Sequence, residues 1–217
     1  MKILAFNGSP RRNGNTATLL DQAIAGAQER GAEVERFDLY TLQFSGCVSC
    51  FSCKRLDRER PIVCVVKDDL QPVLEKVRSA DAICIATPVY YGSETASTRA
   101  LIERLCFPYL NYADYTKSHF PRRIPVGLIY TMNIPQERVE AMGYDVTFGR
   151  TRSTLAREFG ACEIVMACNT TQYDDYSKYE ANATPESKKA YRDAHFAEDC
   201  EKARMLGTQL ANGKLAG

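Results

Sequence analysis

Four cysteines in the first third of the chain are spaced in a way that could hold a redox centre. Cys47, Cys50 and Cys53 stand close together in the run SGCVSCFSCK, and Cys64 follows after a charged stretch. Three thiolates on one short loop can converge on a compact centre, which is the arrangement of ferredoxin-type iron–sulfur clusters. Structural zinc more often takes two separated Cys-x2-Cys pairs. The spacing therefore favours a [4Fe-4S] cluster over zinc.

The remaining cysteines are interpreted as structural residues. The total of nine is odd, and the chain shows no export signal, which argues against a disulfide framework. Apolar runs or helical patterns surround Cys84, Cys106, Cys162, Cys168 and Cys200. His119 and His195 lie in polar surroundings and are expected at the surface. No catalytic side chain is assigned from these residues.

The composition is that of an ordinary globular domain. The chain has 217 residues, of which 45% are hydrophobic and 25% charged, with a formal net charge of +1. A charge so near zero gives no electrostatic case for nucleic acid or an anionic membrane surface. The N-terminal run MKILAFNGS is too short for a signal peptide or a membrane span. We expect one cytoplasmic domain over residues 1–217, with no nucleic-acid or membrane partner.

Short apolar runs alternate with longer helical patterns along the chain. Strands are expected at 2–7, 32–39, 81–88, 124–131 and 161–168, and helices at 16–30, 68–79, 95–107, 144–159 and 185–212. This alternation predicts an α/β fold with a doubly wound five-stranded parallel sheet and helices on both faces. Five strands in a chain of this length fit the strand order 2-1-3-4-5.

Ligands of such a sheet bind beyond the carboxyl ends of its strands, where the order switches between strands one and three. That rule selects the loops 8–16, 87–94 and 131–136. The first loop, NGSPRRNGNT, has no lysine before its threonine and no G-x-G-x-x-G, so it matches neither nucleotide fingerprint. Its hydroxyls, amide and arginine at a helix start suit a single terminal phosphate. A turn with a helix N-cap would explain the same composition.

The second loop, ATPVYYGS, offers a surface for a flat aromatic ring. Pro88 ends the strand, and Val89, Tyr90 and Tyr91 form an aromatic ledge before Gly92. A stacking surface and close backbone approach at a glycine are what such a ring needs. The tyrosines could instead be core aromatics at a strand end. Because both loops meet at one sheet edge, together they favour a ligand with a ring and a phosphate.

These motifs, with CVVKDDL and TRALIERL, resemble the flavodoxin-fold family of NAD(P)H-dependent FMN reductases, and most of all its iron–sulfur flavoprotein branch. The similarity covers about residues 1–135. It implies a flavodoxin-like sheet that binds FMN. The implied phosphate contacts are Ser9, Arg11, Asn15 and Thr16, and the implied ring contacts are Pro88, Val89, Tyr90, Tyr91, Gly92, Thr131 and Met132.

The resemblance also implies metal ligands at Cys47, Cys50, Cys53 and Cys64. The ten residues between the last two form a longer gap than is usual in the family. Such a gap can loop out and return, because closure entropy grows slowly with length. Cluster-free relatives keep some of these cysteines, so unliganded thiols stay open as an alternative.

The implied activity is that of an NAD(P)H-dependent flavin oxidoreductase of the iron–sulfur flavoprotein type. Electrons would pass from NAD(P)H or a low-potential donor through FMN and the cluster to an unidentified small-molecule acceptor or a ferredoxin-like partner. The alternatives are a cluster-free FMN or quinone reductase, a flavodoxin-like electron carrier, and a zinc-stabilised interaction module. The resemblance further implies a homodimer or homotetramer.

Two loops are expected outside the core of the domain, a cysteine-rich loop at 45–67 and an aromatic loop at 106–123. The second is long for a connection in a compact domain, which is typical of functional segments. Its rings, at Tyr109, Tyr112, Tyr115 and Phe120, suit an interface or a lid over the flavin. Alternatively, they cover one end of the core.

Overall fold

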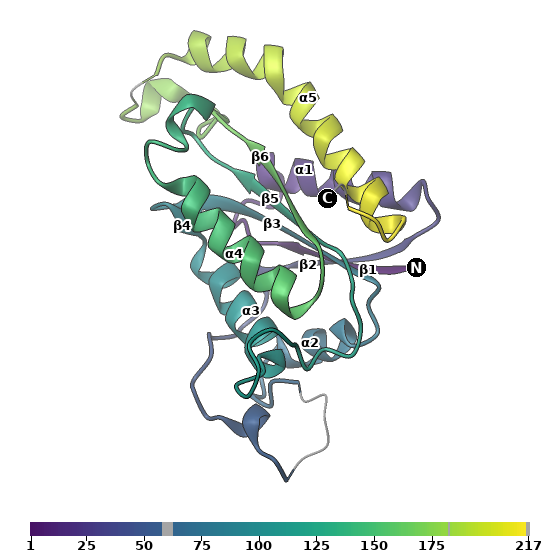
Figure 1. The fold of residues 1–217 in the computed structure, drawn as a ribbon. Coiled ribbons are helices and arrows are strands. Elements are labelled where there is room, and N and C mark those ends of the chain that lie inside the picture. The colour runs from purple at the N-terminus through teal and green to yellow at the C-terminus, as the bar shows by residue number, and fades with distance from the viewer. Residues whose placement is uncertain (58–62, 182, 216–217) are drawn as a thin grey trace.

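A twisted parallel sheet runs through the middle of the protein in a computed structural model that describes residues 1–57, 63–181 and 183–215 (Figure 1). Its long strands are β1 (Lys2–Asn7), β2 (Glu33–Asp38), β3 (Ala82–Tyr90), β5 (Val126–Thr131) and β6 (Cys162–Ala167). They pair in parallel in the order β2-β1-β3-β5-β6. The prediction of a doubly wound parallel sheet is confirmed.

The predicted count of five strands is wrong, because the sheet has a sixth strand, β4 (Ser93–Glu94). It pairs antiparallel with the end of β3, so that Tyr90 lies opposite Ser93. Tyr91 and Gly92 between them both have positive φ, 48° and 79°, as a two-residue hairpin turn requires. With β4 counted, the predicted order 2-1-3-4-5 becomes 2-1-3-5-6.

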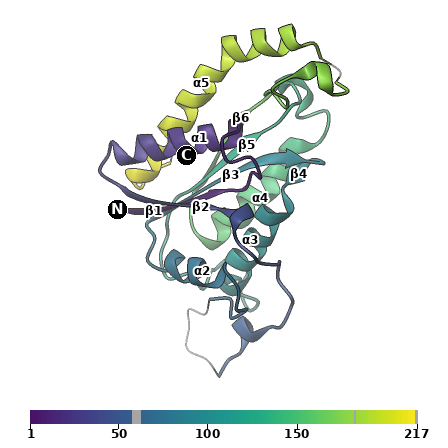
Figure 2. The ribbon, with the colours of Figure 1, turned by 180° about the vertical axis from the view of Figure 1, so that it is seen from behind.

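Five α-helices cover the two faces of the sheet in the described part of the chain. The pair α1 (Asn15–Gln28) and α5 (Pro185–Ala211) lies on one face, and α2 (Gln71–Val77), α3 (Ala96–Cys106) and α4 (Tyr144–Glu158) lie on the other (Figures 1 and 2). Strand β5 is buried along its whole length, because apolar helix faces pack on both sides of it. None of the described helices is long and apolar enough to cross a membrane.

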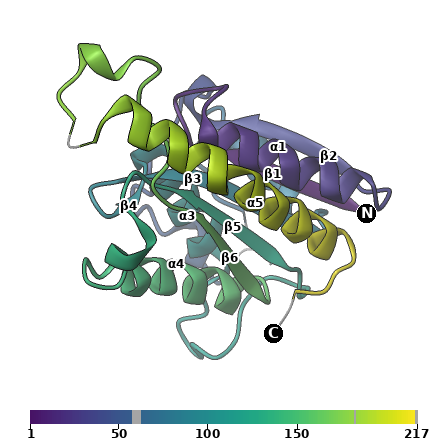
Figure 3. The same ribbon diagram turned by 90° about the horizontal axis from the view of Figure 1, so that it is seen from above.

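Helices α1 and α5 run side by side at backbone contact (Figure 3). A Cβ atom added to Gly207 of α5 would lie 1.8 Å from the carbonyl oxygen of Ala23 in α1. In the same way, a Cβ atom on Gly26 would lie 2.1 Å from the carbonyl oxygen of Arg204. Only glycine allows this approach, so the two helices are held in one register.

The aromatic segment 106–123 leads from the end of α3 to the start of β5, at the sheet edge opposite the predicted ligand loops. Tyr109 and Phe120 are buried and meet edge to face, with ring centroids 4.9 Å apart. Both rings also contact Phe159. Tyr112 and Tyr115 are exposed. For the two buried rings, the core-covering alternative is the one that the structure supports.

We expect Gly207→Ala to lower the free energy of unfolding by about 3 kcal/mol, because the new methyl group forces α1 and α5 apart. Gly149→Ala in α4 is the matched control, since its Cβ would meet nothing within 4 Å. That change should raise the stability by about 0.5 to 1 kcal/mol. Urea unfolding of both variants checks the pair, and equal stabilities would contradict the close helix contact.

Candidate functional site

The loops that follow β1 and β3 are bound tightly to each other at the carboxyl edge of the sheet. The backbone N–H of Gly8 donates to the carbonyl of Ala86 at 2.7 Å, and the Thr95 hydroxyl donates to the carbonyl of Gly8 at 2.8 Å. A Cβ atom on Gly8 would lie 1.9 Å from Oγ1 of Thr98. The glycine thus permits the two loops to meet at the expected switch point between β1 and β3.

The loop after β1 leads directly into the start of α1, where no side chain caps the first amides. Within the described residues, these N–H groups are available to an anion, and the helix dipole favours negative charge there. Ser9 and Thr16 are buried beside them. The Ser9 hydroxyl accepts a hydrogen bond from the Arg11 amide at 3.1 Å. The arrangement is suited to a phosphate group.

Thr131 and Met132, at the end of β5, differ in how they relate to this loop. The hydroxyls of Thr131 and Thr16 are 2.6 Å apart, which links β5 to the loop 8–16 after β1. Met132 is buried in the core, and its amide donates to Ala167 at 3.0 Å. The structure therefore brings Thr131 into contact with the loop 8–16, and the role of Met132 stays a prediction.

The segment after β6 and helix α5 contact the loop 8–16. The sequence analysis did not predict these contacts. The Asn15 side chain donates to the carbonyl of Thr171 at 2.8 Å and accepts from Arg192 at 2.6 Å. The Arg11 guanidinium donates to the carbonyl of Gln172. Two of the four predicted phosphate contacts, Arg11 and Asn15, are thus already held by the C-terminal part of the chain. The polar, tyrosine-rich composition after β6 was the available signal.

The aromatic ledge lies on the β3–β4 hairpin. Pro88 and Val89 are half-buried, whereas Tyr90 is 48% exposed and Tyr91 is fully exposed. Tyr91 adopts a left-handed backbone conformation that is uncommon for a non-glycine residue. A Cβ atom on Gly92 would approach the ring of Tyr144 at 3.2 Å. The ledge presents two tyrosine rings to the outside and is backed by α4.

A buried carboxylate supports the hairpin from inside. Glu94 of β4 accepts a hydrogen bond from the hydroxyl of Tyr130 at 2.5 Å and from that of Ser93 at 2.9 Å. Burial raises the pKa of Glu94, but the hydrogen bonds outweigh it, so that the pKa lies below its usual value. Glu94 therefore remains charged at neutral pH. It faces Arg99 at 3.4 Å.

The second region is the cysteine loop, which projects beyond the α2–α3 end of the molecule (Figures 1 and 2). Residues 58–62 of the expected loop 45–67 lie outside the described residues. One small pocket is lined by Cys47, Cys50, Cys53 and Cys64, together with Arg104 and Phe107 from the end of α3. All nine cysteines are described, and none forms a disulfide. The structure thus brings the four predicted ligands to one place.

The donor set of this pocket fits an iron–sulfur cluster, but the side chains do not form a ready ligand group. Among the described residues, no three His, Cys, Asp or Glu side chains are placed to hold a metal ion. Burial raises the pKa of the Cys53 thiol; Lys54 lowers it, and Cys64 and Cys47 raise it. The three sulfurs therefore share one electrostatic environment. Ser49 and Phe51, which flank Cys50, have positive φ of 52° and 55°.

Arg104 of α3 joins the two ends of the cysteine loop. Its side chain is fully buried and donates to the carbonyl of Ser45 at 3.2 Å, before the first cysteine. It also donates to the carbonyl of Val66 at 3.0 Å and to the carboxylate of Asp68, both after the last cysteine. Burial raises the pKa of Asp68, but the hydrogen bonds from Arg104 bring it below its usual value. The ion pair therefore stabilises the protein above the ordinary carboxyl pKa, and this is lost as the pH falls through the lowered value.

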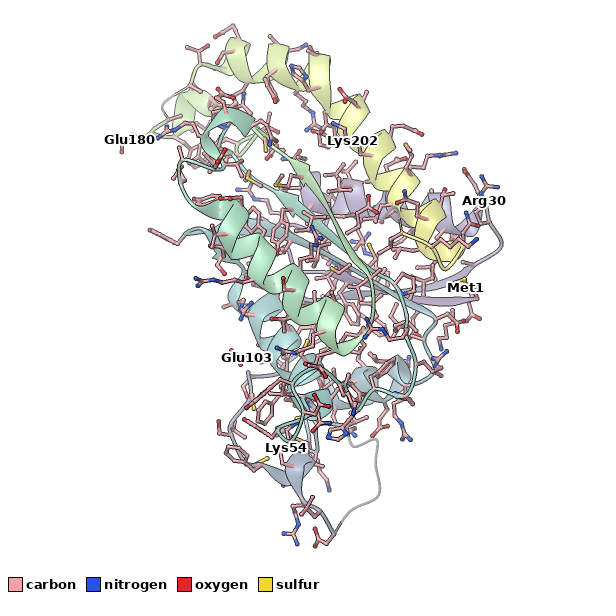
Figure 4. All side chains as sticks on the ribbon, in the orientation of Figure 1. Met1, Arg30, Lys54, Glu103, Glu180 and Lys202 are labelled. Atoms are coloured by element: carbon pink, nitrogen blue, oxygen red, sulfur yellow. The ribbon has the colours of Figure 1, made fainter. Side chains whose placement is uncertain are left out.

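Lys54 and Glu103, both labelled in Figure 4, connect the cysteine loop to the end of α3 and to the segment just after it. The Lys54 ammonium donates to the carbonyls of Leu110 at 2.6 Å and Pro108 at 3.3 Å, and lies over the Phe107 ring. The Glu103 carboxylate accepts from the backbone amide of Cys47 at 3.0 Å. These contacts place Cys47 and Cys53 against the helix terminus.

The ledge and the cysteine pocket lie at opposite ends of α3. Thr95 caps the start of the helix and accepts from the Thr98 amide at 3.3 Å. Arg104 lies nine residues further on, which corresponds to about 14 Å along the axis at 1.5 Å per residue. One helix thus positions both regions of the site.

Comparisons with known proteins identify a family and related chains. Residues 1–132 match the family model described as NADPH-dependent FMN reductase. An iron–sulfur flavoprotein of Methanocaldococcus jannaschii is 34% identical over 104 residues, covering 48% of this chain and 51% of the relative. Another, from Archaeoglobus fulgidus, is 39% identical over 104 residues, covering 48% of each. The chain spans about half the length of the curated relatives it matches.

Solved structures show the same fold over almost the whole chain. An NAD(P)H:quinone oxidoreductase from Methanothermobacter marburgensis superposes with a TM-score of 0.69 at 16% identity, covering 97% of this chain and 96% of that one. An azoreductase from Bacillus anthracis gives a TM-score of 0.63 at 15% identity, covering 96% and 99%. At these identities, the similarity concerns the fold alone.

We expect Asp68→Asn to lower the free energy of unfolding by roughly 3 kcal/mol, because the buried Arg104 guanidinium loses its charged partner. The cysteine loop should also become more sensitive to brief proteolysis, since its downstream end is released. Asp69→Asn is the control, because Asp69 is the exposed neighbour. Among the described residues, its carboxylate accepts only from the backbone N–H of Gln43. Equal loop cleavage in both variants would contradict the role of the ion pair.

Proposed function

The chain belongs to the NADPH-dependent FMN reductase family, and we propose that it is an FMN-dependent oxidoreductase that takes electrons from NAD(P)H or a low-potential donor. The observation that carries this proposal is the junction of the loops 8–16 and 87–94. They meet beyond the carboxyl ends of β1 and β3 through Gly8 and Thr95, which is where such a sheet binds its ligand.

The residues of this junction fit the two halves of FMN. The open amides at the start of α1, with the hydroxyls of Ser9 and Thr16, would hold the phosphate. The ledge at Tyr90 and Tyr91 would contact the isoalloxazine ring of FMN, which needs an apolar surface on one side. When bound, the flavin would accept a hydride and pass its two electrons on one at a time. The chain itself binds, orients and shields it.

We further propose that Cys47, Cys50, Cys53 and Cys64 hold a [4Fe-4S] cluster. The proposal is supported by their common pocket and by the names of the half-length relatives. A cluster would supply one-electron transfer to an acceptor, either a small molecule or a ferredoxin-like protein. Arg104 and Lys54 provide positive charge beside the thiolates, which favours an anionic centre.

A cluster-free FMN or quinone reductase is the second candidate, favoured by the lack of a ready ligand group among the described residues. Iron, sulfide and flavin measured together after anaerobic purification separate the two candidates. Iron and sulfide near four atoms per chain would support the cluster. Flavin without iron would leave the cluster-free reductase.

A homodimer or homotetramer is part of the proposal. Tyr90 and Tyr91 expose large rings on a rigid hairpin, and exposed apolar groups of this kind mark contact surfaces. A second copy placed against the ledge would cover the outer side of the ring system. Light scattering of the flavin-loaded protein measures the number of subunits.

The purified protein should be yellow or should take up added FMN, and NAD(P)H should bleach it. We expect Ser9→Ala to weaken FMN binding roughly tenfold or more, because a hydroxyl facing the charged phosphate is lost. Riboflavin lacks the phosphate, so its affinity should be the same for both proteins, which serves as the control. A protein that remains colourless with excess FMN would falsify the proposed function.

The two kinds of cysteine should respond differently to serine. Cys50→Ser should remove or convert the cluster and leave FMN bound, because the flavin loops lie at the other end of α3. Cys84→Ser should leave the iron content unchanged, since Cys84 is buried in the core, where burial raises its thiol pKa to about 12. Iron analysis and visible spectra check both variants. Equally low iron in wild type and Cys50→Ser would contradict the cluster.

A further inference from the structure

The guanidinium of Arg104 has one donor that its known contacts do not use. Its two terminal nitrogens bind Ser45, Val66 and Asp68. Its Nε is fully buried and has no hydrogen-bond partner among the described residues. Buried N–H groups are rarely left unpaired, and each exception asks for an explanation.

The missing partner can be sought in the pocket that this residue lines. Arg104 shares the pocket wall with the four cysteines, and Cys64 stands two residues before its Val66 contact. The Val66 carbonyl accepts from one terminal nitrogen of the same guanidinium, so the backbone just after Cys64 lies against Arg104. The Cys64 sulfur, in the same pocket wall, is a chemically suitable acceptor for the unused guanidinium donor.

We propose that Arg104 is a positioning residue for the cysteine centre, whose Nε–H donates a hydrogen bond to the Cys64 sulfur when that thiolate binds iron. The inference rests on the proposed cluster and goes beyond it, since it assigns a role to a residue that is not a ligand. It explains how the fourth ligand is held despite the ten-residue gap after Cys53. The same side chain fixes both ends of the loop and orients its last thiolate.

A hydrogen bond to a ligand sulfur also has an electronic effect. Reduction adds negative charge to the cluster, and a donor directed at a sulfur stabilises the reduced form more than the oxidised form. The bond from Nε therefore raises the reduction potential. Its loss should lower the potential even where the positive charge is retained.

Arg104→Lys tests this step, because lysine keeps the charge facing Asp68 but has no Nε–H. The matched control is Arg122→Lys. Arg122 likewise bridges a carboxylate and two carbonyls, those of Asp81, Ala80 and Arg78, but it does not line the cysteine pocket. Both proteins are purified anaerobically with wild type, and their iron content and cluster potentials are measured.

We expect Arg104→Lys to shift the ratio of reduced to oxidised cluster at least tenfold towards the oxidised form at a fixed potential, which is about 59 mV for a one-electron couple. Arg122→Lys should match wild type. An Arg104→Lys protein with normal iron and an unchanged potential overturns the hydrogen bond. Wild-type protein that binds no iron overturns the cluster itself, and with it this inference.

A measurement on wild type keeps the test valid if Arg104→Lys fails to fold. Protein labelled with ¹⁵N only at the Nε of arginine is reduced, and pulsed electron paramagnetic resonance is recorded on the paramagnetic cluster. A weakly coupled ¹⁵N nucleus supports the contact, because Arg104 is the arginine that lines the pocket among the described residues. A spectrum without ¹⁵N coupling overturns it.

Discussion

A buried positive charge at the end of α3 determines how the cysteine loop can be built. Removing the Arg104 guanidinium from water is costly unless acceptors surround it. The chain provides them from both sides of the loop, at Ser45, Val66 and Asp68. Hydrogen bonding to this charge therefore holds Ser45 close to Val66 and Asp68, which lie more than twenty positions later in the chain. The loop between them can vary in length without changing where its ends lie.

Helix α3 connects this constraint to the two loops that are proposed to bind FMN. Its first turn is fixed by Thr95 and Thr98 against Gly8 and Thr87. Its last turn carries Arg104, and the segment just after it accepts a hydrogen bond from Lys54 at Leu110. Each end is thus specified by a separate group of hydrogen bonds. The two regions can change independently as long as the helix keeps its length, and their separation within one chain is a property of that helix.

Much of the fold could be predicted from the sequence, because strands buried on both faces leave continuous apolar runs such as 124–131. The β3–β4 hairpin was missed since Tyr91 takes a left-handed conformation that sequence patterns assign to glycine or asparagine. Arg104 was missed because a single arginine in an amphipathic helix is usually solvated. Its burial depends on acceptors distant in sequence.

Likewise, the sequence predicts the local features of the candidate site but not its long-range contacts. The loops after β1 and β3 carry local signals, so Ser9, Thr16 and the ledge could be proposed before the fold was known. The bonds from Thr171, Gln172 and Arg192 to the first loop could not. They join residues more than 150 positions apart, and no short motif encodes such a contact.

The close contact of α1 and α5 has a consequence for the order in which the molecule is completed during synthesis. The loop 8–16 emerges from the ribosome first. Asn15 can accept its hydrogen bond from Arg192 only after α5 has been made. Docking of α5 requires Gly26 and Gly207 to be in register. Contacts of such long sequence separation form late. Until then the loop 8–16 lacks these contacts, so its final geometry is reached only after α5 has been made and docked.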